Sequence, residues 1–86
     1  MHVEIYGSPV LCADTEAAKA LCDRRRYSHV VRDAAGDLIS LCELRRRAPL
    51  SATLPQIFVG THHVGDLAAF EAAERAGIIE QLLGGQ

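Results

Sequence analysis

The sequence lacks several features that mark particular classes of protein. It has no tryptophan, aromatic residues make up only 5% of it, and its three cysteines are an odd number at irregular spacing. Such a set of thiols does not form the paired framework of a small secreted disulfide-rich domain. No apolar run approaches the roughly 20 residues that span a bilayer, and a basic-then-apolar signal peptide is missing. We therefore expect a cytoplasmic protein with a free thiol and no membrane contact.

The charge balance excludes other partners. Hydrophobic residues make up 49% of the chain and charged residues 23%, with a formal net charge of -2. Nothing in this balance attracts nucleic acid. No repeat, low-complexity tract or long linker divides the 86 residues. We expect one domain over residues 1–86, and a monomer.

Alternating and helical spacings of apolar residues predict the element order β-α-β-α-β-β-α. A right-handed crossover through the first helix would place the second strand parallel to the first. The later strands would form a hairpin around Gly60 and Thr61. The result is an α/β fold, a four-stranded mixed sheet with helices on both faces. The strands are predicted at 2–6, 27–32, 56–59 and 62–64. Helices are predicted at 13–25, from about 35 or 37 to 47, from a cap at Asp66 to Gly77, and as a final turn or two at 78–83.

Two of these predicted helices carry an expected buried stripe. In the second helix it consists of Leu38, Leu41, Cys42 and Leu44. In the last turns the apolar residues expected against the core are Ile78, Ile79, Leu82 and Leu83.

Cys12 is predicted to lie where the first strand gives way to the first helix. Unpaired backbone N–H groups at a helix start stabilise a thiolate, and open α/β sheets bind ligands at this end of their strands. One helical turn brings Thr15 back over Cys12, so its hydroxyl or N–H is expected to bond the sulfur. Asp14 raises the pKa of the thiol while the helix terminus lowers it, and the sequence leaves the balance open.

The other thiols and the histidines favour structural roles. Cys22 lies ten residues after Cys12, or about 15 Å along a helix, too far to form a disulfide with it in a rigid molecule. Cys22 and Cys42 are both predicted to pack in the core. No CxxC pair is present, so no zinc site is expected. His62 and His63 should point to opposite faces of a strand, which excludes a shared metal; His63 is interpreted as a strand residue.

Several segments, in order and at matching separations, resemble the glutaredoxins of the thioredoxin-fold superfamily. They are "VEIY", Cys12, "AKAL" and then "TLPQIFVGTHHVG", where the family reads close to "TVPQIFIDGxHIGG". The resemblance covers nearly the whole chain. It implies a thioredoxin-type fold, a cis bond before Pro55 and a backbone at Leu54 that pairs with the cysteine of glutathione. The glutathione site that it implies consists of Thr53, Leu54, Pro55, Gly65 and Asp66.

The chain departs from the family at the motif itself. Dithiol glutaredoxins have CxxC, whereas this chain has "CADT", so no disulfide can form inside the motif. Monothiol members carry serine in the last position, and Thr15 is its nearest relative. This implies that Cys12 takes the glutathionyl group from glutathionylated or disulfide-containing proteins, and that a second glutathione regenerates it. Ser8 stands where many relatives carry lysine. The acidic residues that follow "GG" in the family are missing here, and Asp66 can replace them only by a changed geometry, so weaker glutathione binding is expected.

Two arginine triplets, 24–26 and 45–47, fall at predicted helix C-termini. Cations there offset the helix dipole, which explains both triplets without a ligand. The alternative is that an arginine of the second triplet reaches the glycine carboxylate of glutathione, as basic residues near this helix do in relatives.

The resemblance leaves three functions open. The first is a glutathione-dependent thiol–disulfide oxidoreductase that acts through Cys12, with Thr15 beside it and glutathione as co-substrate. The second is a [2Fe–2S] carrier, in which two subunits each supply Cys12 and two glutathiones complete the ligands. The third is a redox-silent binding module that keeps the fold without the chemistry.

Overall fold

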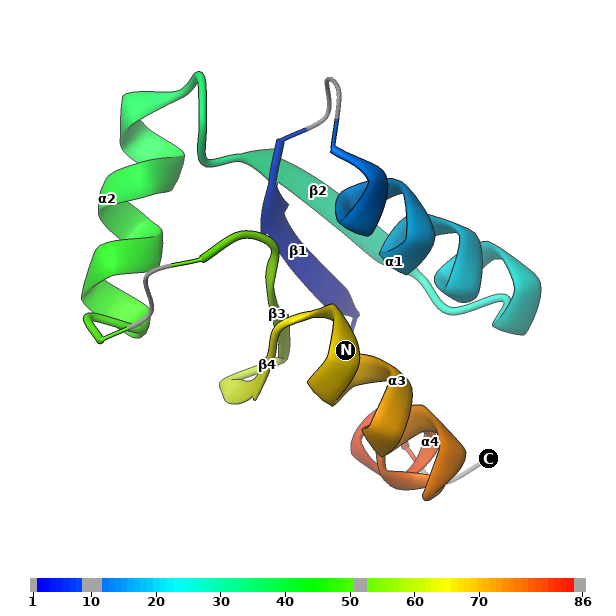
Figure 1. The fold of residues 1–86 in the computed structure, drawn as a ribbon. Coiled ribbons are helices and arrows are strands. Elements are labelled where there is room, and N and C mark those ends of the chain that lie inside the picture. The colour runs from blue at the N-terminus through cyan, green and yellow to red at the C-terminus, as the bar shows by residue number, and fades with distance from the viewer. Residues whose placement is uncertain (1, 9–11, 51–52, 85–86) are drawn as a thin grey trace.

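The computed structural model describes residues 2–8, 12–50 and 53–84. The elements follow the predicted order, and the last turns form a short helix of their own (Figure 1). Within the described ranges, no helix combines the length and the apolar character needed to cross a membrane. The elements are β1 (Val3–Gly7), α1 (Ala13–Arg25), β2 (His29–Asp33), α2 (Leu38–Arg47), β3 (Gln56–Val59), β4 (His62–Gly65), α3 (Leu67–Arg75) and α4 (Ile78–Leu82).

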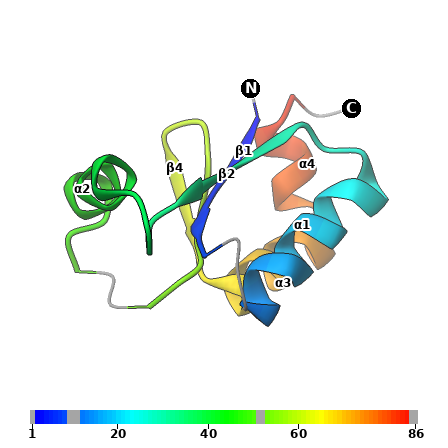
Figure 2. The same cartoon turned by 90° about the horizontal axis from the view of Figure 1, so that it is seen from above.

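The four strands form one mixed sheet in the order β2-β1-β3-β4. β1 runs parallel to β2 and antiparallel to β3, and β3 forms the predicted hairpin with β4. Helices α1, α3 and α4 lie on one face of the sheet and α2 lies alone on the other (Figure 2). The mixed sheet with helices on both faces is therefore confirmed.

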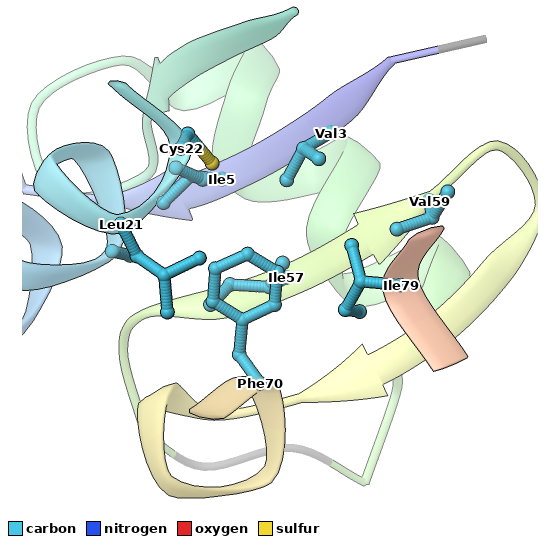
Figure 3. Close-up of a cluster of buried hydrophobic side chains, with 9 residues drawn as sticks. Val3, Ile5, Leu21, Cys22, Ile57, Val59, Phe70 and Ile79 are labelled. Atoms are coloured by element: carbon cyan, nitrogen blue, oxygen red, sulfur yellow. The ribbon is translucent and has the colours of Figure 1, made fainter. Parts of the chain in front are cut away.

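The main core lies between the sheet and the three helices α1, α3 and α4 (Figure 3). Alternate residues of β1 and β3 point into it, as the period of a strand requires. Burying each large apolar side chain contributes about 1.5–3 kcal/mol. Its buried residues are Val3, Ile5, Ala18, Leu21, Cys22, Ile57, Val59, Phe70 and Ile79.

A smaller cluster lies on the α2 face. It consists of Tyr6, Ala34, Leu44, Ala48 and Phe58. The Tyr6 and Phe58 rings meet edge to face, with centroids 5.5 Å apart. Among the described residues, α2 is the one helix on this face, and its apolar contact with the sheet is made through Leu44 and Ala48.

The predicted buried stripe of α2 is wrong at two positions. The Leu38 side chain is 73% exposed and Cys42 is also exposed, while Leu44 is buried. The inward face runs instead through Ser40, Leu44 and Ala48, which are four residues apart and share one side of the helix. Positions 38 and 42 lie about 200° away from position 40 around the helix. Ser40 is tolerated there because its hydroxyl donates to Asp37 at 2.7 Å.

The second strand begins two residues later than predicted, at His29. Arg26 adopts a left-handed conformation with φ of 60°, and the Tyr27 N–H donates to the Cys22 carbonyl at 2.8 Å. Tyr27 therefore belongs to the C-terminal cap of α1. At the other end of the chain, Ile79 is buried but Ile78, which was expected to pack, is 43% exposed.

Candidate functional site

Cys12 is the N-cap residue of α1, at the predicted junction of strand and helix. Its backbone is extended, and its carbonyl accepts the first helical hydrogen bond from the Glu16 N–H at 3.1 Å. The thiol makes no capping bond and is partly exposed. The sulfur therefore lies among the unpaired N–H groups of the first turn with access to solvent.

Thr15 supplies the contact to the sulfur that the helical spacing predicted. Its hydroxyl donates to Cys12 Sγ at 3.1 Å, and the residue is fully buried. This bond lowers the pKa of the Cys12 thiol, aided by the backbone N–H groups of Thr15, Asp14 and Ser8 and opposed by partial burial. The sequence left open whether the pKa of Cys12 is raised or lowered; here it is lowered, which favours the thiolate.

Gly7 fixes this arrangement, and sequence reasoning missed it. A Cβ at Gly7 would overlap the Thr15 hydroxyl and lie 3.3 Å from Pro55 Cβ. The bare backbone lets the end of β1 contact the start of α1 and the segment that leads into β3. The predicted strand ended at residue 6, whereas Gly7 is the last residue of β1, and a glycine at the end of an apolar strand was the available signal.

The segment before β3 runs between α2 and α3 (Figures 1 and 2). The Leu54–Pro55 peptide bond is cis, as the resemblance implied. Pro55 is buried, whereas Thr53 and Leu54 are exposed. These two residues, called the dividing segment below, line two grooves at once.

The grooves on the two sides of the dividing segment differ in charge. The groove toward α2 has a volume of about 620 Å³ and is lined by apolar residues and Arg45. The groove toward α3 has a volume of about 390 Å³, and Asp14, Asp66 and Glu71 line it. Asp14 lies in the first turn of α1, two residues after Cys12, so one wall of the acidic groove belongs to the helix that starts at the thiol.

Gly65 and Asp66 lie at the start of α3. The φ of Gly65 is 126°, and a Cβ there would lie 2.9 Å from Ala69 Cβ, so a side chain is excluded. Asp66 is the predicted N-cap and accepts from the Ala69 N–H at 2.9 Å. Of the predicted glutathione residues, the structure brings Thr53, Leu54 and Asp66 to the acidic groove.

Neither of the other cysteines shares this environment. Burial, together with the charges of Asp23 and Glu74, raises the pKa of Cys22 to about 12. Cys42 is exposed on α2. In the described part of the chain, no group of three or more His, Cys, Asp or Glu side chains is placed to hold a metal ion.

Two arginines of the second triplet, Arg45 and Arg47, have different contacts. Arg47 donates to Glu4 at 2.9 Å, to the Tyr6 hydroxyl at 3.0 Å and to the Gly60 carbonyl at 2.7 Å, so it ties α2 to the sheet. Arg45 instead lines the groove beside the dividing segment. If one of these arginines meets a ligand, the structure favours Arg45.

Comparison with known proteins gives a consistent result. No family model and no curated protein matches the chain. Among solved structures, a glutaredoxin from Brucella melitensis is 34% identical with a TM-score of 0.75, over 96% of this chain and 88% of that one. A dithiolic glutaredoxin from Trypanosoma brucei brucei is 23% identical with a TM-score of 0.78, over 96% and 87%. A buckwheat glutaredoxin in complex with glutathione shares 17% identity and a TM-score of 0.79, over 94% and 74%. The last two show the fold, and the first shows the family. The chain therefore belongs to the glutaredoxin family.

Proposed function

We propose that the protein is a glutathione-dependent thiol–disulfide oxidoreductase that acts through Cys12 alone. The Cys12 thiolate attacks the glutathione sulfur of a protein–glutathione mixed disulfide, and the protein sulfur leaves as a thiolate that takes up a proton. The thiolate of a second glutathione then attacks the glutathionyl sulfur on Cys12. Oxidised glutathione leaves, and the Cys12 thiolate is restored.

The observation that carries this proposal is the bond from Thr15 to the Cys12 sulfur. The sulfur is partly exposed, and one hydroxyl and several N–H groups are directed at it. Donors that stabilise a thiolate help both steps, because the thiolate is the nucleophile in the first and the leaving group in the second.

The absence of a nearby partner thiol supports the single-cysteine route. Thr15 occupies the last position of the motif. Cys22 is buried ten residues further along α1, where the raised pKa keeps it protonated. An external thiol therefore has to complete the cycle.

The two grooves support glutathione as that thiol. The glycine end of glutathione carries a carboxylate, which Arg45 is placed to meet. The γ-glutamyl end carries an ammonium and a carboxylate. The ammonium suits the carboxylates of the acidic groove, and the carboxylate suits the first N–H groups of α3. The cysteine between them would pair with the backbone of Leu54.

Mass spectrometry after incubation with oxidised glutathione tests the chemistry. We expect a glutathione adduct on Cys12 that reduced glutathione removes and that Cys12→Ser abolishes. Cys42 is the internal control, because it is an exposed thiol without the donors that surround Cys12. Equal adduct rates on the two thiols, or turnover that survives Cys12→Ser, would contradict the proposal.

A matched pair of arginine variants tests the ligand. Arg45 lines the groove, whereas Arg46 is exposed next to it and is not among the lining residues. We expect Arg45→Glu to raise the KM for glutathione about tenfold or less and Arg46→Glu to leave it nearly unchanged. An equal effect of both variants would indicate only a long-range charge effect.

A further inference from the structure

Gln56 connects three parts of the chain behind the dividing segment. It is the first residue of β3, and only 5% of its surface is exposed. Its side-chain NH₂ donates to the Thr53 carbonyl at 3.0 Å and contacts the Thr53 hydroxyl at 3.3 Å. Its side-chain oxygen lies 2.7 Å from His63 Nε2 in β4. One buried amide thus joins the dividing segment to the β3–β4 hairpin.

The chemistry of the partners fixes the direction of each bond. A main-chain carbonyl can only accept, so the NH₂ group of Gln56 must face Thr53. The amide oxygen must then face His63, which donates from Nε2. His63 is itself held by its ring, which stacks on Phe58 with centroids 4.6 Å apart and an angle of 21° between planes.

We propose that Gln56 and His63 are positioning residues for ligand binding at the dividing segment. Thr53 lies outside the helices and strands and borders both grooves, so its position sets the width of each. Gln56 holds Thr53 to the sheet, and His63 holds the amide of Gln56 in the orientation that can donate. The identity of the ligand, the glutathionyl group, rests on the function proposed above.

Binding of S-methylglutathione, which cannot form a disulfide, measures the effect by calorimetry. We expect Gln56→Leu to weaken binding about tenfold, because Thr53 loses both contacts. His63→Phe keeps the stack on Phe58 but loses the donor, and we expect about a threefold loss. The double variant should bind no more weakly than Gln56→Leu, because His63 acts through Gln56. His63→Gln, whose amide can donate, should restore binding, and His62→Phe is the control on the adjacent exposed histidine.

A second measurement separates a positioning role of Gln56 and His63 from a general loss of structure at the site. The pH dependence of Cys12 alkylation should not change in any of these variants, because the donors to the sulfur come from Thr15, Asp14 and Ser8. If Gln56→Leu does not fold, Gln56→Glu replaces it. That variant keeps an acceptor for His63 but places an oxygen against the Thr53 carbonyl, so the same loss of binding is expected.

Backbone order parameters in the free protein keep this proposal distinct from the proposed function. We expect those of Thr53 and Leu54 to fall in Gln56→Leu while those of β1 stay unchanged. If the wild-type protein does not bind S-methylglutathione, the proposed function fails and the order parameters alone decide the role of Gln56. The positioning role of Gln56 would be overturned if the order parameters of Thr53 and Leu54 do not change in Gln56→Leu, or if this variant binds within twofold of wild type.

Discussion

Replacing Thr15 by valine should change how the Cys12 thiol depends on pH in a specific way. Thr15 is fully buried, and its hydroxyl donates to the sulfur at 3.1 Å. Valine has nearly the same shape, so the packing is kept while the donor is lost. A hydrogen bond to a charged group contributes about 1.5–3 kcal/mol, and the partly exposed sulfur places this bond at the low end. The acid dissociation constant of the Cys12 thiol should then fall about tenfold, and the thiolate population falls by the same factor at any pH below the pKa of both proteins.

The reaction rate should fall by less than the thiolate population. A thiolate that loses a donor becomes more nucleophilic, with a Brønsted coefficient of about 0.4–0.5, which returns roughly a factor of three. At a pH below the pKa of the thiol in both proteins, Thr15→Val should therefore react about three to four times more slowly than the wild-type protein. At a pH high enough to ionise both proteins fully, it should react about three times faster. The two pH–rate curves should cross.

The assay follows release of pyridinethione from dipyridyl disulfide over a range of pH. A Cys42→Ser background leaves Cys12 as the accessible thiol, since Cys22 is buried. Thr15→Ser keeps the hydroxyl and should follow the wild-type curve. Superimposed curves for Thr15→Val and wild type would refute the assignment of the lowered pKa to this hydroxyl. A parallel loss of rate at every pH would indicate misplacement of the sulfur instead.

Three further predictions follow from other contacts. Gly7→Ala should lower the free energy of unfolding by about 1–3 kcal/mol in urea titrations, since the added Cβ overlaps Thr15; an unchanged midpoint would contradict this close contact. Iodoacetamide at pH 8 should label Cys22 only after unfolding, because burial raises its pKa to about 12, and mass spectrometry of the native protein should find it unmodified. Burial alone would raise the pKa of Glu4, but hydrogen bonds from Arg47 and Arg32 lower it below its usual value. Glu4→Gln should therefore destabilise by about 1–3 kcal/mol at pH 7. That difference should shrink as pH falls below about 4.3 through the lower folded pKa; a pH-independent difference in urea unfolding would argue against the ion pairs.

The parts of the site that were predicted correctly depend on local periodicity. A helix returns after three to four residues, so Thr15 could be placed over Cys12 from spacing alone. The strand and helix order followed from apolar patterns within single elements, and the N-cap at Asp66 from its residue type. The cis bond before Pro55 came from the family resemblance, because most X-Pro bonds are trans.

The parts that were missed depend on contacts between distant segments. The role of Gly7 lies in its close approach both to Thr15 and to Pro55, which is 48 residues away in the sequence. The apolar residues of α2 fit a helical spacing at Leu38 and Cys42, yet the sheet meets the face through Ser40 and Leu44. A helix pattern shows which residues share a face, but only packing decides which face is covered when the apolar residues spread around the helix.

The opposite charges of the two grooves bear on how a ligand reaches the sulfur. A glutathionyl group bound in reverse would place its glycine carboxylate beside Asp14, Asp66 and Glu71, and would leave Arg45 without that partner. Two like charges 4 Å apart repel by about 1 kcal/mol in water and about 4 kcal/mol near a protein surface. For glutathione bound as proposed, this repulsion favours one direction by about fivefold or more. If the protein binds glutathione as proposed, the two grooves select one direction of the ligand by penalising the reversed one, not by strengthening the correct one.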